Sequence, residues 1–81
     1  MQEIDVTSRF DRKGKIIPVT FELEGKEYRV DGVGRRWEDE KGEHILVMVQ
    51  PNNRVYELLI KSADGVWWMV KQHGHPFRKT A

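Results

Sequence analysis

Cysteine is absent from this sequence, and no uninterrupted apolar run exceeds five residues. Without cysteine the chain has no disulfide bond, no thiolate zinc site and no cysteine nucleophile, and the absence fits a reducing compartment. An apolar run as short as residues 45–49 cannot span a bilayer, and the N-terminus lacks the basic start and apolar segment of a signal peptide. We therefore expect a cytoplasmic protein that makes no contact with a membrane.

Neither sign of charge predominates, because 14 basic residues face 13 acidic ones and the net charge is +1. A nearly neutral protein has no global field that would attract a polyanion. The last eleven residues are nevertheless basic, since Lys71, Arg78 and Lys79 stand there without an acidic residue, beside His73 and His75. We interpret this stretch as a solvated tail after a single domain, because 81 residues leave no room for a second core.

Six clusters of turn-forming residues divide the chain into short segments. They lie at residues 11–14, 24–26, 31–32, 40–42, 51–53 and 64–65. In the segments at residues 4–10 and 17–23, apolar side chains alternate with polar ones, which is the period of a half-buried β-strand. Pro18 lacks the N–H that a sheet ladder needs, so we expect its strand to lie at an edge or Pro18 to face an unpaired side.

The second half of the chain continues this pattern. Residues 28–37 predict a strand with a bulge or bend at residues 31–32. Residues 45–49 predict a central strand, because side chains on both of its faces are apolar. Residues 55–61 fit either a strand or one face of a helix, and the hairpin signal at residues 64–65 favours the strand.

Five or six short antiparallel strands in 81 residues predict a strongly bent meander that closes into a small all-β barrel, because closure removes exposed strand edges. We expect an SH3-like barrel, since the connections have the pattern of simple hairpins, and an OB-like barrel is the alternative. On this interpretation residues 1–72 form the single barrel domain. Residues 73–81 then form a flexible, basic, histidine-containing C-terminal tail.

Trp67 and Trp68 stand side by side in the last predicted strand, where consecutive side chains point to opposite faces of the sheet. One core cannot bury both rings, so we expect the chain's own tail, a second copy of the protein or a ligand to cover the outer one. A two-residue loop at residues 64–65 sets Ile60 opposite Met69. That register turns Trp67 inward, whereas a three-residue loop reverses the faces. We favour the first register, which leaves Trp68 outside.

An ordered set of landmarks runs along nearly the whole chain. They are Gly14 followed by residues 18–21 (Pro-Val-Thr-Phe), residues 25–30 (Gly-Lys-Glu-Tyr-Arg-Val), Arg36 with Trp37, residues 55–58 (Val-Tyr-Glu-Leu) and residues 64–68 (Asp-Gly-Val-Trp-Trp). In this pattern the chain resembles a family of uncharacterised small bacterial β-domains, a numbered domain of unknown function. The resemblance implies a β-domain fold and, because such domains sometimes accompany Y-family DNA polymerases, a link to DNA repair. Such domains tend to stop near Lys71, where this chain adds its tail.

The residue patterns that support catalysis or cofactor binding are missing. Neither serine lies in a strand-to-helix elbow, and the carboxylates at residues 38–40 flank a glycine turn, where we expect them to be solvated. His73 and His75 could present two imidazoles on one side of an extended segment, with His44 as a distant third, but two histidines make a weak metal site. Residues 32–35 lack the later glycine and the helix of a dinucleotide-binding fingerprint. We therefore predict no enzyme, no cofactor and no metal site.

Recognition through aromatic and basic side chains is the remaining function that the composition supports. Tryptophan, tyrosine and arginine are favoured at protein interfaces, and similar residues stack on bases and neutralise phosphates in single-stranded nucleic acids. The candidate binding residues are Trp68, Trp37, Arg35, Arg36, Lys61, Lys71, Arg78 and Lys79. We predict a non-catalytic module that contacts a protein partner or a second copy of itself, with nucleic acid as the alternative partner. A purely structural domain, with Trp37 inside the barrel and the tail over the outer tryptophan, is a further alternative.

Overall fold

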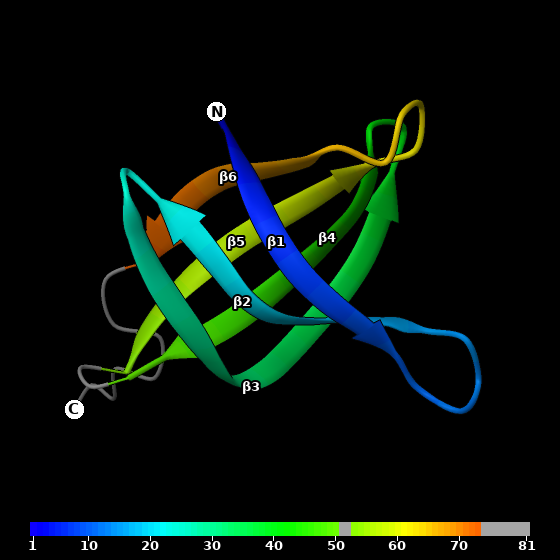
Figure 1. The fold of residues 1–81 in the computed structure, drawn as a ribbon. Helices are drawn as coiled ribbons and strands as arrows, with labels where there is room; N and C mark the ends of the chain where they lie inside the picture. The colour runs from blue at the N-terminus through cyan, green and yellow to red at the C-terminus, as the bar shows by residue number, and fades with distance from the viewer. Residues whose placement is uncertain (51–52, 74–81) are drawn as a thin grey trace, which may run out of the picture.

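The computed structural model describes residues 1–50 and 53–73, which form six β-strands in a closed barrel (Figure 1). The strands are β1 (Gln2–Phe10), β2 (Ile16–Leu23), β3 (Lys26–Asp39), β4 (Gly42–Val49), β5 (Arg54–Lys61) and β6 (Trp67–His73). The predicted all-β barrel is confirmed, including the strand expected at residues 55–61. In the part of the chain that the structure describes, no helix has the length and apolarity needed to cross a membrane.

Each strand pairs antiparallel with the next one along the chain, and β6 returns to pair with β1 (Figure 1). The pairing of β1 with β6 is short: Gln2, Glu3 and Ile4 lie opposite Met69, Trp68 and Trp67. We call these three pairs the seam. The seam joins the two strand edges that a flat meander would leave exposed, which is the physical advantage of closure.

The third strand is long and bent, and it serves two neighbours in turn. Its first four residues pair with β2, and its pairing with β4 begins at Val30. The β3–β4 register shifts between Val30 and Gly32 and again between Val33 and Arg36, so the predicted bend at residues 31–32 is confirmed. Bulges of this kind bend a strand and increase its twist, which lets β3 leave β2 and continue beside β4.

Inward-facing side chains from all six strands form one apolar core. Phe21, Ile45, Tyr56 and Leu58 are at most 1% exposed. The Phe21 ring stacks on the Tyr28 ring with centroids 5.2 Å apart, and the Tyr56 ring meets both of them edge-on. Aromatic pairs of this geometry stabilise a core beyond the area that they bury, so this cluster helps to fix how β2, β3 and β5 meet.

The last hairpin sends its two tryptophans to opposite faces of the sheet. Trp67 belongs to the core and is 8% exposed. Trp68 lies outside the core cluster, half-buried and opposite Leu59. The prediction that Trp67 faces inward and Trp68 outward is therefore confirmed.

The predicted register of this hairpin is wrong by two residues, because Ile60 lies opposite Trp67 and not opposite Met69. The connection is a four-residue loop, residues 62–65, closed by a hydrogen bond between the backbones of the residues on either side. Gly65 has a φ of 72° and donates its N–H back across the loop at 2.9 Å. A shift of two residues leaves every side chain on its predicted face, since side chains alternate with period two.

Candidate binding site on the outer wall

Four side chains from four neighbouring strands lie in one row across the outside of the barrel. Trp37 of β3 is opposite His44 of β4, His44 is opposite Leu59 of β5, and Leu59 is opposite Trp68 of β6. We call this set the cross-strand row, and we call the outward-facing surface of β3 to β6 the outer wall. The two indoles are half-buried, and the two side chains between them are buried. The row thus presents two aromatic groups about three strand spacings, or about 14 Å, apart.

A cation lies over each indole of the row. The Arg35 guanidinium is 5.1 Å from the ring centroid of Trp37, and the Lys61 ammonium is 4.5 Å from that of Trp68. The Trp37 ring also stacks on the His44 imidazole, with centroids 5.1 Å apart and planes 5° from parallel. The alternative in which Trp37 fills the barrel is therefore wrong. Each cation–π contact contributes roughly 0.5–1 kcal/mol at an exposed site, so four predicted binding residues form two stabilised pairs.

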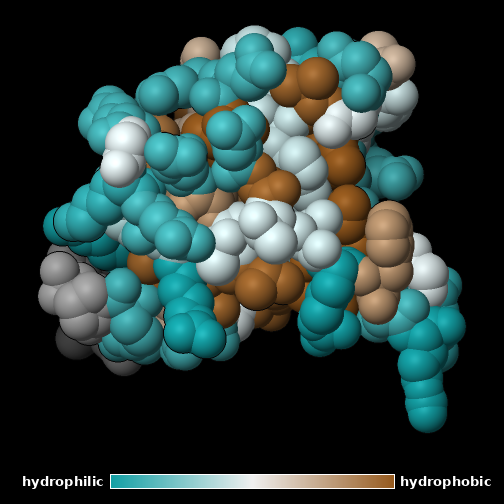
Figure 2. Space-filling view, viewed as in Figure 1, coloured by the Kyte–Doolittle hydropathy of each residue, from teal (hydrophilic) through white to brown (hydrophobic). Residues whose placement is uncertain are grey.

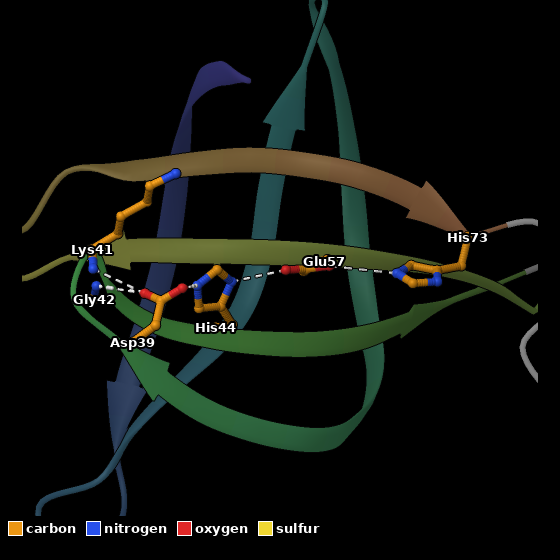
Figure 3. A network of polar contacts seen from close by, with 6 residues as sticks. All are labelled: Asp39, Lys41, Gly42, His44, Glu57 and His73. Carbon is orange, nitrogen blue, oxygen red and sulfur yellow. Dashed lines mark hydrogen bonds and ion pairs between the residues drawn. The ribbon is translucent and has the colours of Figure 1, made fainter.

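A chain of polar side chains links the same four strands on the outer wall (Figure 3). Asp39 Oδ2 is 2.9 Å from His44 Nε2, His44 Nδ1 is 2.8 Å from Glu57 Oε2, and Glu57 Oε1 is 3.6 Å from His73 Nε2. We call these four residues the polar chain. His44 and Glu57 are each 7% exposed. Because a buried carboxylate needs a charged or hydrogen-bonding partner, the polar chain accommodates Glu57 in an otherwise apolar part of β5.

His44 stands between two carboxylates, and both of its ring nitrogens are engaged. Each ring nitrogen has a carboxylate oxygen within hydrogen-bond distance, so the two carboxylates hold the imidazole from both sides. A general base needs a free lone pair within reach of its substrate, and neither nitrogen of His44 offers one in this arrangement.

Asp39 joins the polar chain to the turn between β3 and β4. Its Oδ1 accepts hydrogen bonds from the backbone N–H groups of Lys41 at 2.9 Å and of Gly42 at 3.3 Å (Figure 3). The Lys41 N–H is the largest influence that lowers the pKa of Asp39 below its ordinary 3.8, and the His44 ring acts in the same direction. The sequence predicts solvated carboxylates at residues 38–40, and all three residues are exposed, although Asp39 also contacts the buried imidazole of His44.

A groove of about 300 Å³ lies on the outer wall beside the polar chain. Leu46, Met48 and Val55 make its apolar floor. Arg35 borders the groove from β3, and His73 borders it from β6. The groove is therefore an apolar depression between basic side chains.

Arg36, one of the predicted binding residues, points away from the outer wall. Its Nε donates to Glu43 Oε2 at 2.8 Å, and its Nη2 donates to the Ile16 carbonyl oxygen at 2.8 Å. These bonds fasten β3 to β4 and to the start of β2. The structure thus gives the Arg36 guanidinium a place in holding strands together, apart from Trp37 and Trp68.

The remaining predicted binding residues are basic and lie near the C-terminus. Lys71 is exposed on β6, opposite Glu57, and adds a third cation to the outer wall. Arg78 and Lys79 lie outside the described residues, as does His75. Among the residues that the structure does describe, no group of three or more histidine and acidic side chains could hold a metal ion.

His44 and Glu57 are the residues of this wall whose roles the sequence analysis missed. The sequence suggests His44 only as a distant metal ligand and gives Glu57 no role. A signal does exist, because Glu57 places an acid between the apolar residues Tyr56 and Leu58 in a strand. An acid that is buried in such a strand requires a partner, and His44 on the neighbouring strand is a basic side chain that could supply one.

The wall formed by β1, β2 and the start of β3 carries negative charge. Asp5 lies opposite Glu22, and Glu22 lies opposite Glu27, so three carboxylates form an acidic row across three strands. Figure 2 views the molecule from the side on which β1 and β2 lie in front, and hydrophilic side chains cover much of that face. The acidic row and the cations of the outer wall are therefore carried by different strand segments.

Comparisons of this chain with models of protein families, with curated proteins and with solved structures find no match. The fold and the surface define a class of protein: a small antiparallel six-stranded barrel with an aromatic and basic outer wall.

Proposed function

We propose that the protein is a non-catalytic binding module whose outer wall contacts a protein partner or a second copy of the chain. The cross-strand row carries this proposal, because Trp37 and Trp68 are held on the outside of the barrel, each with a cation over its ring. Tryptophan and arginine dominate the energetic centres of protein interfaces, since tryptophan buries a large area and arginine offers several hydrogen-bond donors and stacks on aromatic rings. The row is also ordered in advance by its buried middle, which reduces the entropy lost on binding.

The finer classification belongs to the same proposal: we place the barrel with the SH3-like folds and the protein in the cytoplasm. The pairing of each strand with its neighbour in sequence supports an SH3-like meander, because the OB-fold is a Greek-key barrel. The absence of cysteine supports a reducing compartment.

Single-stranded nucleic acid is the second candidate partner, and the pairing of each indole with a cation favours it. If the cation moves to a phosphate group, the exposed indole face can stack on a base, and such a stack is worth about 1–3 kcal/mol. The resemblance to domains that accompany Y-family DNA polymerases adds a link to DNA repair. The acidic row lies on other strand segments, so it does not directly oppose phosphates at the outer wall.

A fluorescence titration separates these two candidates. Intrinsic tryptophan fluorescence is followed while single-stranded oligo(dT) is added at about 50 mM and at about 200 mM salt. Three phosphate contacts, through Arg35, Lys61 and Lys71, would give a slope of about −2 in a plot of log affinity against log salt. The proposal of a protein partner expects no quenching even at the lower salt. Quenching that follows this slope, and that is lost when Lys61 and Lys71 are both changed to alanine, assigns the wall to nucleic acid.

Sedimentation velocity tests contact with a second copy. The parent protein and Trp68→Ala are compared over a wide range of concentration, and self-association through the row predicts that the variant associates at least about tenfold more weakly. Phe10→Ala is the matched control, because it truncates a ring that is 67% exposed on β1, away from the row. Equal weakening by both variants contradicts an interface built on the row. A concentration-independent monomer in all three proteins leaves a different protein as the partner.

A further inference from the structure

The groove on the outer wall exists because β3 places glycine beside two apolar side chains of β4. Gly32 lies opposite Met48, and a Cβ built on Gly34 would be 3.9 Å from the Cβ of Leu46. No side chain at either glycine covers its β4 neighbour, and both neighbours are half-buried. Val55, opposite Met48 on β5, completes the floor.

The floor of the groove suits one kind of ligand. Aliphatic carbons and a thioether make no strong hydrogen bonds, so a nucleobase placed there would lose the hydrogen bonds that its polar edge makes with water. A large apolar side chain makes no hydrogen bonds with water that it could lose, and its burial is favourable. The flexible side chain of Met48 can adapt to its shape. The volume of about 300 Å³ lies at the lower end of ligand pockets, which matches a side chain better than a large cofactor.

Two permanently charged cations, Arg35 and Lys71, lie near the floor, together with His73. Arg35 borders the groove from β3, His73 borders it from β6, and Lys71 stands two residues before His73 on the same strand. Glu57, the acid on the outward face of β5, is buried and faces His44 and His73. Complementary charge therefore selects an acidic ligand.

We infer that the groove binds a large apolar side chain from an acidic protein segment, whose carboxylates pair with Arg35 and Lys71. This inference rests on the proposed function of the outer wall, and it selects a protein over a nucleic acid as the partner. The apolar side chain supplies affinity, and the carboxylates supply orientation and a faster encounter. Arg35 both borders the groove and lies over Trp37, so one partner can engage the groove and the cross-strand row together.

A synthetic peptide of defined sequence tests the inference. The probe is acetyl-Asp-Glu-Leu-Phe-Asp-Glu-amide, added to the 81-residue protein with isotope-labelled methyl groups. We expect saturable shifts of the NMR signals from the methyl groups of Leu46, Met48 and Val55. One control peptide carries lysine in place of the acids, and another carries alanine in place of leucine and phenylalanine. Each control should bind at least about tenfold more weakly than the probe.

Gly34→Leu tests the site itself, because the added side chain fills the groove from its edge. Its Cβ meets Leu46 only at 3.8 Å and 3.9 Å, which are ordinary contact distances, so we expect the barrel to fold, and thermal unfolding checks this. The variant should bind the probe peptide at least about tenfold more weakly. Thr7→Leu adds the same side chain at an exposed position of β1, and it is the matched control that should leave binding unchanged.

Other results identify other occupants and overturn the inference. The groove does not take the acidic peptide if the methyl signals show no saturable shift, or if they shift equally in Gly34→Leu. Contacts of these methyl groups with residues 74–81 in the free protein assign the groove to the chain's own C-terminal segment. Shifts that follow protein concentration alone assign it to a second copy.

The inference and the proposed function can fail separately. If the indole signals of Trp37 and Trp68 respond to oligo(dT) or to self-association while the groove ignores the peptide, the inference fails and a binding role of the outer wall stands. If neither the indoles nor the groove responds to the peptide, to oligo(dT) or to protein concentration, the inference fails, and nucleic acid and a second copy are both excluded as partners of the outer wall.

Discussion

At the scale of single residues, the buried pair of His44 and Glu57 stabilises the barrel only while both partners are present. Removing one partner of a buried ion pair costs about 3–5 kcal/mol, whereas replacing both by apolar side chains is often neutral or stabilising. We therefore expect His44→Leu to lower the free energy of unfolding by about 3 kcal/mol, and the addition of Glu57→Met to recover most of that loss. Urea unfolding of the single and double variants measures the coupling. If each single variant lowers the free energy of unfolding by less than about 1 kcal/mol, the prediction of a strongly coupled buried pair is contradicted.

Gly42 is a residue whose missing side chain is itself required. Its φ is 151°, and a Cβ there would collide with the carbonyl oxygen of Ile60 on β5. We expect Gly42→Ala to push β4 and β5 apart and to cost about 2 kcal/mol or more, which lowers Tm by about 10 °C. Circular dichroism during heating measures this change.

Gly34→Ala is the control for Gly42→Ala. An added Cβ at Gly34 meets only Leu46, at ordinary contact distances, so the change in the free energy of unfolding should stay below about 1 kcal/mol. Equal losses of unfolding free energy in the two variants would contradict the prediction, because they would show that the backbone near Gly42 accommodates a Cβ.

At the scale of elements, two turns make the barrel sensitive to acid. Asp11 accepts hydrogen bonds from the backbone N–H groups of Lys13 and Lys15, and the Lys15 N–H is the largest influence that lowers the pKa of Asp11. Asp39 accepts backbone hydrogen bonds in the same way at the turn between β3 and β4, where the Lys41 N–H is the largest influence that lowers its pKa. The pKa values of both carboxyls in the folded protein lie below the ordinary 3.8. The ionised carboxylates therefore stabilise the fold at pH values above 3.8, and this stabilisation is lost as the pH falls through the pKa values of the folded protein.

Asp39→Asn should therefore flatten the fall in Tm between about pH 5 and about pH 2.5, compared with the parent. The amide keeps one acceptor for the turn but cannot ionise, so the acid-dependent part of the stability disappears. Asp11→Asn is the matched control: it should flatten the same profile without changing the tryptophan fluorescence, whereas Asp39→Asn should change it, because His44 contacts both Asp39 and Trp37. A profile unchanged by Asp39→Asn contradicts the assignment.

The acidic row of β1, β2 and β3 is a local source of instability, because like charges directly opposite each other in a sheet are unfavourable. Glu22 stands between two acids, Asp5 and Glu27. We expect Glu22→Lys to raise the free energy of unfolding by about 0.5–1 kcal/mol at low salt, and by less at high salt, where exposed charges are screened. Glu40→Lys, the same change of charge in an exposed turn, is the control and should have a smaller effect. Equal gains in both variants would assign the effect to net charge.

Much of the strand pattern could be predicted from the sequence, because apolar and polar side chains alternate at residues 4–10 and 17–23, residues 45–49 form an apolar run, and each turn carries glycine or asparagine. The strand of Pro18 does not lie at an edge, because the barrel is closed, but Pro18 has no partner in β3 and lies opposite Ser8, next to a register shift in the β1–β2 ladder. The register of the last hairpin could not be predicted, since two-residue and four-residue loops put the same side chains on the same faces. The sequence therefore predicts which face of the sheet a side chain occupies more reliably than it predicts which residue lies opposite it on the next strand.

The sequence predicts several residues of the outer wall but not how these residues are aligned across the strands. Trp37, Trp68 and their neighbouring cations are visible in the sequence, but their alignment depends on the bulges in β3, which set Trp37 opposite His44. The sequence predicts the irregularity at residues 31–32, but no residue pattern predicts the second one, between Val33 and Arg36. The polar chain depends on the β4–β5 register in the same way, since His44 and Glu57 lie thirteen residues apart and meet only through that pairing.

At the scale of the whole molecule, a net charge of +1 conceals an uneven surface. Acids form a row on β1 to β3, and cations gather on the outer wall. An acidic partner is attracted to the cations of the outer wall and repelled by the acidic row, so the electrostatic field orients the partner before contact. Association with such a partner should slow as salt rises, which stopped-flow fluorescence can follow.

The seam gives the barrel a late step in folding. Residues 2–4 pair with residues 67–69, so the cylinder cannot close during synthesis until residue 69 has left the ribosome. We expect neighbouring hairpins to form first and closure to follow the rate-limiting barrier. Ile4→Ala should then speed unfolding severalfold and leave the refolding rate nearly unchanged in stopped-flow measurements, whereas a slowing of refolding would place closure in the nucleus. The first and last strands thus act as a clasp, whose strength governs how long the closed cylinder lasts.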